Sequence, residues 1–326
     1  MKRCNGMHAV MAALMAAAVA MAVAADARAD YPSHTVKLLV GQSPGGSTDV
    51  IARLVAAQMT ETLGQSVIVE NRTGNAGSLA ADFVAKSKPD GYTLLVVSSS
   101  FSINPSLSAL PFDAQTDLAP VTLLAEAPFL LVVNPAFPAN TLPELLKLAA
   151  ARPGTLTYGS GGNGSSGHLA GALLEQLADR HFIHVPYKGA GPALNDVMGG
   201  HIDFLFASVL SSSQAVNQGK LRALAVSSAT RSAALPNVPT VAEGGVTGYS
   251  ATTWYAILAP AGTPADIIDR VAAAGKSAVN APNVRKVLLD DGAEPIGSTP
   301  AEFKTYLATQ IAKWRALVKR FGIRGE

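Results

Sequence analysis

The chain has 326 residues, a formal net charge of +2 and only 6% aromatic residues. Nucleic-acid-binding domains usually carry a strongly basic face, so this near-balance of charge excludes nucleic acid as an expected partner. A chain of this length is usually divided between two units with separate hydrophobic cores.

The first 29 residues have the pattern of a secretory signal peptide. Lys2 and Arg3 precede an apolar run over residues 9–25, and Ala27-Arg28-Ala29 matches a small-x-small cleavage site. We expect cleavage after Ala29 and export to the periplasm, with an uncleaved anchor as the alternative. The later apolar runs are too short to cross a bilayer, so we expect no direct membrane insertion of the mature chain.

Processing would also change the charge and the cysteine content. The segment before residue 30 contains three of the 25 basic residues and one of the 23 acidic residues, so 22 of each remain. The single cysteine of the sequence, Cys4, lies in the same segment. The mature chain is therefore expected to have no net charge, no disulfide and no cysteine-based metal site.

Short apolar strands alternate with glycine-rich turns and helices along the remaining chain. A β-branched run over 36–40 precedes a turn and a helix from Thr48 to Leu63, which Gly64 ends. The same alternation predicts further strands over 67–69, 92–97, 155–158, 182–185, 202–206 and 221–226, and helices over 79–84, 141–151 and 168–178. Such alternation is typical of mainly parallel sheets covered by helices on both faces.

The last third of the chain returns to helices, and two extended runs flank the middle section. Pro264, Pro282 and the Thr299-Pro300-Ala301-Glu302 capping box each open a helix. The extended runs at 127–134 and 252–258 are interpreted as two crossings between lobes. The sequence thus predicts an α/β fold with one lobe from residues 30–127 plus 254–326 and a second from residues 128–253.

Two glycine-rich loops, at 41–49 and 159–168, each lie between a predicted strand and a predicted helix. The first turn of a helix has free N–H donors and a partial positive charge, so such a loop can bind an anion without lysine or arginine. We expect ligand contacts from Pro44, Gly45, Gly46, Ser47, Thr48 and Asp49 in the first loop, and from Asn163, Gly164, Ser165, Ser166 and His168 in the second.

Several of these residues have a structural alternative. An acid at Asp49 stabilises a first helical turn and has Arg53 as its i+4 partner, and we slightly favour that role over ligand contact. Ser165 or Ser166 could serve as a helix cap alone. For His168, capping and ligand contact are weighted equally.

Further candidate contacts follow the ends of strands, where ligands gather in open α/β sheets. Ser98, Ser100 and Phe101 follow one strand, and Tyr187 and Ser208 lie at comparable strand ends in the other lobe. Trp254 lies in a predicted crossing, so we interpret it as part of the hinge core.

The two loops imitate enzyme motifs without completing them. Residues 41–48 approximate a P-loop, but Ser47 stands where the phosphate-binding lysine belongs. The same loop matches G-x-S-x-G, yet Pro44 follows the serine and has no N–H for an oxyanion hole. Residues 159–164 match G-x-G-x-x-G, but no acid for a ribose ends the next strand. We expect no catalytic residue and no cofactor.

A metal site is not predicted either. His181 and His184 are three apart on an expected strand and would face opposite sides of it. His34 and His201 are isolated in the sequence. We therefore expect structural or surface roles for these histidines.

The residues quoted above, together with further short motifs in the same order, resemble one protein family over essentially the whole mature chain. The order resembles the Bug family, the TctC-like receptors of tripartite tricarboxylate transporters. The motifs are Tyr31-Pro32-Ser33, Pro44-Gly45-Gly46-Ser47-Thr48-Asp49, Val69-Glu70-Asn71-Arg72, Pro89-Asp90-Gly91-Tyr92-Thr93-Leu94, Asn163-Gly164-Ser165-Ser166-Gly167-His168, His184-Val185-Pro186-Tyr187-Lys188-Gly189, 258–264 and Gly292-Ala293-Glu294-Pro295.

The resemblance implies a monomeric, two-lobed periplasmic binding protein of the type II-like class. It implies a small carboxylate held between loops of the two lobes, mainly by main-chain donors, small hydroxyls and water, and a two-component membrane permease as partner. One departure is Gly41-Gln42-Ser43, where the family often has an apolar-aromatic-proline run. A ligand-dependent signalling adaptor and, less favoured, a periplasmic serine hydrolase are the alternative functions.

Overall fold

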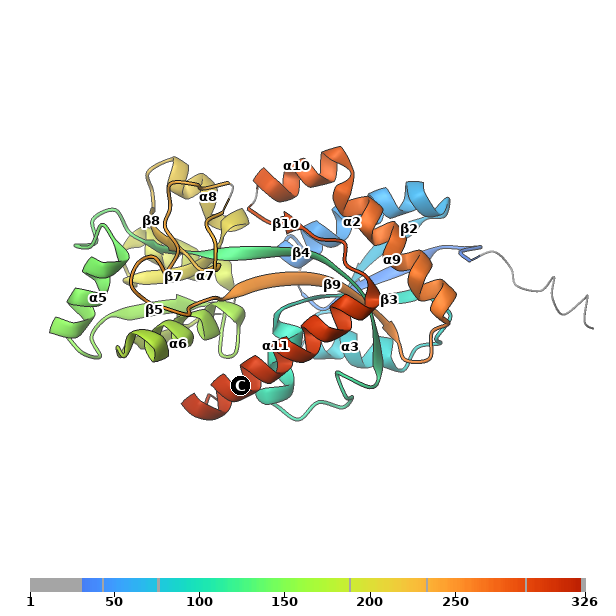
Figure 1. Cartoon of the computed structure of the whole chain (residues 1–326), viewed down its shortest axis with the longest axis horizontal. Coiled ribbons are helices and arrows are strands. Elements are labelled where there is room, and N and C mark those ends of the chain that lie inside the picture. The colour runs from blue at the N-terminus through green and yellow to red at the C-terminus, as the bar shows by residue number, and fades with distance from the viewer. Residues whose placement is uncertain are drawn as a thin grey trace, which may run out of the picture.

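The computed structural model describes residues 31–42, 44–74, 77–187, 189–232, 234–290 and 292–323. The expected signal peptide with Cys4 and the cleavage point after Ala29 lies outside the described residues, and so does Ser43. Two long strands, β4 (Leu118–Val133) and β9 (Thr252–Pro260), run through the middle of the molecule, and the other elements gather around their two ends (Figure 1).

One group of strands surrounds the first part of β4. It contains β1 (Val36–Val40), β2 (Val67–Asn71), β3 (Thr93–Ser98) and the short β10 (Glu294–Pro295). β1 pairs in parallel with β2 and β3, and β3 pairs antiparallel with β9. The helices of this group are α2 (Ser47–Leu63), α3 (Ser78–Ala85), α4 (Ser100–Ile103), η2 (Asn104–Ser106), α9 (Ala265–Asn280), α10 (Pro282–Asp290) and α11 (Pro300–Phe321).

A second group surrounds the last five residues of β4. Its strands are β5 (Thr157–Ser160), β6 (Ile183–Pro186), β7 (Phe204–Ser208) and β8 (Arg222–Val226), and its helices are α5 (Leu142–Ala151), α6 (Ser166–Ala178), α7 (Ala190–Gly199) and α8 (Val209–Asn217). β5 pairs in parallel with β6 and β7. β7 and β8 lie antiparallel to residues 129–133 of β4.

The two groups form one mixed sheet in the order β2-β1-β3-β9-β4-β7-β5-β6, with β8 and β10 also paired to β4. The parallel pairs lie toward its two ends and the antiparallel pairs in its centre, because β4 and β9 run antiparallel to each other over residues 118–128 and 252–260. The mainly parallel pairing that the sequence predicts therefore describes the outer strands, whereas the crossing strands make the whole sheet mixed.

Helices cover both faces of each group of strands, and the packing produces four apolar clusters. Two clusters sandwich the first group, and two sandwich the second. α11 takes part in two of them: Phe303 and Ile311 pack with the first group, whereas Trp314 and Leu317 pack with the second. The C-terminal helix is thus a third connection between the groups, beside β4 and β9.

The helix boundaries follow local signals in the sequence. Gly64 ends α2 in the left-handed conformation at φ 69° and donates its N–H to the Thr60 carbonyl. The Thr299–Glu302 capping box of α11 is complete. At α5, Thr141 accepts the Glu144 N–H, but the Glu144 carboxylate accepts the N–H of Asn140 instead of that of Thr141.

Candidate functional site

The first glycine loop leads into α2 without a side-chain cap. Pro44, Gly45 and Gly46 are exposed, and Ser47 begins the helix. Gly45 has φ +80°, a conformation that residues with a side chain rarely adopt. Within the part of the chain that the structure describes, no side chain caps the helix at Gly46. The first N–H groups of α2 are therefore available to an acceptor that approaches the loop.

Asp49 braces this loop from the first turn of α2. Its carboxylate is buried; Oδ2 accepts hydrogen bonds from the Gly45 N–H and from Arg53 Nε, both at 2.9 Å, and Oδ1 accepts one from Asn71 Nδ2 at 2.8 Å. The hydrogen bond from Arg53, with those from Gly45 and Asn71, lowers the pKa of Asp49 to about 2 against the opposing effect of burial. The pairing with Arg53 that the sequence predicts is present, and a ligand contact of Asp49 stays a prediction.

The second loop, between β5 and α6, is held by serine and histidine side chains. Ser165 caps α6 by accepting the His168 N–H at 3.3 Å, and His168 Nδ1 accepts the Gly164 N–H at 3.0 Å. A neutral His168 therefore carries its proton on Nε2. Asn163 is exposed at the tip of the loop. The Ser165 side chain therefore acts as the cap of α6, and the buried ring of His168 holds the loop in place through its hydrogen bond with Gly164.

A pair of histidines lies beneath this loop. The rings of His168 and His184 stack with centroids 3.8 Å apart and an interplanar angle of 1°. His184 Nε2 lies 2.6 Å from Ser160 Oγ, which also accepts the Gly162 N–H. Burial, reinforced by the charge of His184, lowers the pKa of His168 to about 3, and burial lowers that of His184 to about 4. Both rings are therefore neutral at pH 7.

The serine run after β3 faces the second loop. Ser99 Oγ lies 2.7 Å from Ser166 Oγ in the first turn of α6 and 3.1 Å from Thr253 Oγ1 of β9. Ser98 and Ser100 are hydrogen-bonded to each other at 3.0 Å. Ser98, Ser100 and Ser166 are contacts predicted from the sequence, whereas Ser99, the buried residue that joins the two groups of elements, was not predicted.

The second loop also packs closely against Leu107, the residue that follows η2. A Cβ placed on Gly164, which has φ +71°, would lie 1.9 Å from Leu107 Cδ1. Only a glycine permits this approach without displacing Leu107. The contact brings the loop before α6 next to the segment that follows Ser99.

Two further predicted contacts, Ser208 and Tyr187, have partners within the second group. Ser208 caps α8 by accepting the Ser211 N–H at 3.3 Å, and it also lines a small apolar pocket beside Val50 and Ile51 of α2. Tyr187 donates its hydroxyl to Asp196 at 2.6 Å; burial, with that hydrogen bond, raises the pKa of Tyr187 to about 12. Ser208 thus lies against the first group, whereas Tyr187 is tied to α7.

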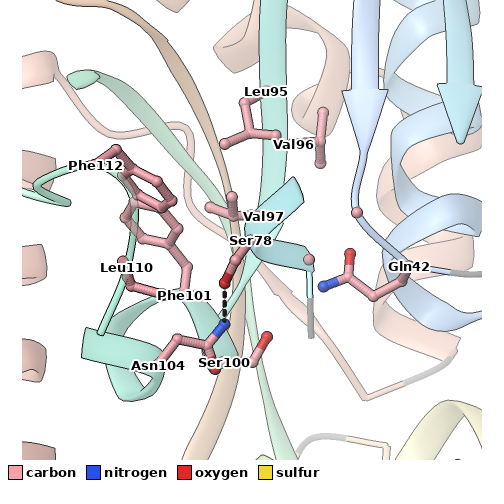
Figure 2. Close-up of a pocket in the computed structure, with 12 residues that line it drawn as sticks. Gln42, Ser78, Leu95, Val96, Val97, Ser100, Phe101, Asn104, Leu110 and Phe112 are labelled. Carbon is pink, nitrogen blue, oxygen red and sulfur yellow. Dashed lines mark hydrogen bonds between the residues drawn. The ribbon is translucent and has the colours of Figure 1, made fainter. Parts of the chain in front are cut away.

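A pocket in the first group opens beside the first loop (Figure 2). Leu95, Val96 and Val97 of β3 line one side, and the rings of Phe101 and Phe112 stack in its wall. Its polar side chains are Gln42, Ser78, Ser100 and Asn104. Phe101 and Ser100 are contacts predicted from the sequence, whereas Gln42, Ser78 and Asn104 were not predicted. Residues 74–78 repeat the strand–glycine–helix pattern of the two selected loops, and that pattern could have indicated Ser78.

Other kinds of site find little support. In the part of the chain that the structure describes, no group of three or more histidine, cysteine, aspartate and glutamate side chains could hold a metal ion. His181 lies before β6 and contacts Glu175, while His184 lies within β6. Trp254 is fully buried and packs edge-on against Phe303, consistent with the predicted role in the core. None of the described helices is long and apolar enough to span a membrane.

Comparison with known proteins identifies the family. Residues 51–323 match the family model described as "Tripartite tricarboxylate transporter family receptor". Protein BugT of Bordetella pertussis is 35% identical over 297 residues, which cover 90% of this chain and 91% of BugT. The solved structure of "R. palustris Rpa4515 with adipate" is 34% identical, with a TM-score of 0.84 over 91% of this chain and 100% of that one.

A second solved structure, "MatC (Rpa3494) from Rhodopseudomonas palustris with bound malate", is 32% identical, with a TM-score of 0.78 over 88% of this chain and 100% of that one. These similarities extend over nearly the whole described chain and confirm the predicted α/β periplasmic-binding-protein fold. The chain therefore belongs to the TctC family of periplasmic solute receptors, which bind solutes and are not enzymes.

Proposed function

We propose that this receptor binds a small organic carboxylate between two lobes and presents it to the membrane subunits of a tripartite transporter. The proposed lobes are residues 30–127 plus 254–326 and residues 128–253. Their division is supported by the pairing of β4, which contacts β9 up to Pro128 and β7 and β8 from Phe129 onward. The ligand would lie between the first loop and the second loop.

The observation that carries the proposal is the uncapped start of α2. Gly45 and Gly46 are exposed beside the helix start, and among the described residues no side chain caps α2 at Gly46. A helix N-terminus attracts negative charge through these donors and through the helix dipole. A carboxylate bound at Gly46, Ser47 and Thr48 would satisfy the donors with its two oxygens.

The charges around the loop support an anion held without a cationic side chain. Arg53 is the basic residue of α2 nearest the loop, and its guanidinium already donates to Asp49 and Asn71. With the Arg53 guanidinium engaged in this way, the main-chain amides and the hydroxyls of Ser47 and Thr48 are the donors that the loop offers to a ligand. This selects small carboxylates over sugars, whose sites usually present aromatic platforms.

The relatives support the ligand class and the partner. Two family members were solved with adipate and with malate, both dicarboxylates. The family description names receptors of a tripartite transporter, so the partners proposed here are its two membrane subunits.

The proposal is tested by calorimetric titration of the purified protein with a panel of mono- and dicarboxylates that includes adipate and malate. We expect at least one carboxylate to bind with a Kd in the micromolar range or below, and sugars of similar size not to bind. Mass spectrometry of any ligand released on denaturation would identify the carboxylate independently. A protein that binds sugars but no carboxylate would contradict the proposal.

The contact between the lobes gives a second prediction. Replacing Ser99 by alanine removes the hydrogen bond to Ser166 and should weaken carboxylate binding about three- to tenfold, because a neutral hydrogen bond contributes roughly 1 kcal/mol. Titration calorimetry measures the change. Ser108→Ala, at an exposed position, is the matched control and should bind normally. Equal affinities for Ser99→Ala and the control would show that this contact does not stabilise the liganded state.

A further inference from the structure

The C-terminal helix α11 carries an unbalanced positive charge. Its sequence contains five basic residues and one acidic residue, Glu302, whose carboxylate accepts the Thr299 N–H at the start of the helix. By contrast, α9 contains two basic and two acidic residues. Four of the five basic side chains of α11 are exposed: Lys304, Arg315, Lys319 and Arg320. The outer surface of this helix is therefore positively charged along most of its length.

The helix dipole explains only part of this charge. Lys319 and Arg320 lie in the last turn of α11, where the partial negative charge of the helix end stabilises a cation. Arg315 lies more than one turn earlier, so the dipole does not account for it. Among the described residues, neither Arg315 nor Arg320 has a hydrogen-bond or ion-pair partner. Both guanidinium groups therefore remain available to an anionic group from outside the chain.

Two hollows lie along α11, and each is lined by one of these arginines. Arg315 lines a hollow of about 440 Å³ beside residues 105–115 of the first group. Arg320 lines a hollow of about 550 Å³ beside α5 and α6 of the second group. Figure 1 shows α11 extending from the first group of elements toward the second. A partner that enters both hollows would contact both groups at once.

The acidic side chains of the hollows leave the arginines without partners. In the first hollow, the Asp113 carboxylate accepts the N–H groups of the two residues at 115 and 116. In the second, Glu175 pairs with His181. Asp179 and Arg180 also line the second hollow and carry opposite charges. The free N–H donors of the two α11 arginines thus distinguish these hollows as sites for an external carboxylate.

The chemistry of the surface indicates an acidic partner. A guanidinium presents N–H donors in a fork that matches the two oxygens of a carboxylate. The family of this chain comprises receptors of a tripartite transporter, whose membrane subunits would meet the receptor in the periplasm. Membrane proteins concentrate lysine and arginine in their cytoplasmic loops, so their periplasmic loops are comparatively poor in positive charge. Acidic residues in such loops would complement α11.

A lipid surface fits the same helix less well. Helices that bind in the membrane interface bury large apolar side chains below the lipid headgroups. Between the exposed cations of α11, the exposed residues include Ala308, Thr309 and Ala312. These small side chains provide no apolar anchor, whereas the adjacent hollows can accept protruding loops.

We propose that the outer surface of α11, with the hollows at Arg315 and Arg320, is the surface on which the membrane subunits of the transporter dock through acidic periplasmic loops. The inference rests on the proposed function, which supplies the transporter as the partner. It concerns a surface separate from the two glycine loops proposed to bind the carboxylate, so docking and ligand binding can be tested separately.

The test reverses both charges by combining Arg315→Glu with Arg320→Glu. Uptake is measured in the native bacterium with the variant in place of the unmodified receptor, using the radiolabelled carboxylate that binds most tightly in the calorimetric panel. We expect uptake at limiting receptor to fall about tenfold or more, because like charges that face each other across an interface are strongly unfavourable. The Kd for the same carboxylate and the thermal unfolding midpoint should be unchanged.

Two further pairs of substitutions serve as controls. Lys88→Glu combined with Arg270→Glu makes the same change in net charge at exposed positions outside α11, and it should keep uptake within about twofold. Arg315→Lys combined with Arg320→Lys retains both charges and should retain more uptake than the glutamate pair. If the glutamate pair lowers the thermal midpoint, Arg315→Gln with Arg320→Gln tests the same contacts without adding negative charge.

The outcomes separate the two proposals. Equal uptake by the α11 variant and the Lys88 and Arg270 control would overturn the docking surface and leave the carboxylate site intact. Sedimentation with vesicles of phosphatidylglycerol and phosphatidylcholine tests a lipid partner, and binding that the glutamate pair abolishes would assign the surface to lipid and overturn the inference. An unmodified receptor that binds no carboxylate, or binds one without supporting its uptake, would contradict the proposed function itself.

Discussion

Replacing Gly46 by valine should abolish carboxylate binding and leave the fold intact. Gly46 is exposed and has φ −73° and ψ 161°, an extended conformation that valine adopts without strain. The branched side chain would stand beside the first N–H groups of α2 and block the approach of a carboxylate. Because charge-assisted hydrogen bonds contribute roughly 1.5–3 kcal/mol each, losing two of them should reduce affinity about 100-fold or more.

Titration calorimetry measures this loss, and the thermal unfolding midpoint shows whether the fold is retained. Gly46→Ala is the graded control, since a single methyl group should crowd the helix start less and retain part of the affinity. Normal binding by a folded Gly46→Val variant would remove the first loop from the site and, with it, the main support for the proposed function.

Mild acid should destabilise the receptor through the stacked histidines beneath the second loop. The pKa values of His168 and His184 in the folded protein are about 3 and 4, well below the value near 6.5 that histidine has in an unfolded chain. Between pH 6.5 and 4 the unfolded state therefore binds up to two more protons. The stabilisation is fully present above pH 6.5 and is lost as the pH falls toward the folded-state pKa values.

The expected loss between pH 7 and pH 5 is on the order of 2–4 kcal/mol in the free energy of unfolding. Urea unfolding at several pH values measures it. His184→Gln removes one of the two titrating rings and should roughly halve the slope, whereas His201→Gln, at an exposed position, should not change it. A slope that is the same in His184→Gln and the unmodified protein would show that the pair does not control acid stability.

Much of the fold could be predicted because the local sequence signals for helices and strands agree with the way these elements pack in the structure. The helical spacing from Thr48 to Leu63 and the terminating Gly64 define α2 to within one residue. The extended run predicted over 127–134 is only the second half of β4, which begins at Leu118. Pro120 and the polar Thr122 interrupt the apolar pattern of the first half, and register shifts against β9 near these residues accommodate them.

The sequence predicts which loops form the candidate site, but it does not predict which side chains meet across that site. Glycine followed by a helix start identifies the loops before α2 and α6, because the local backbone dictates both features. Ser99 was missed because its importance comes from Ser166, which lies 67 residues away in sequence. Gln42 and Asn104 were missed for a similar reason, because they line one pocket only after separate segments of the chain pack together.

The bridging position of α11 bears on how far the receptor can open. Trp314 and Leu317 are buried in the core of the second group, while Phe303 and Ile311 of the same helix are buried with the first group of strands. A large rotation of one group relative to the other about β4 and β9 would remove Trp314 from the core of the second group. The apolar surface exposed in this way would cost roughly 1.5–3 kcal/mol for each large side chain. If the two groups are the lobes proposed above, the packing of the C-terminal helix against both would oppose a large rotation between them, and ligand entry would then require only small rotations.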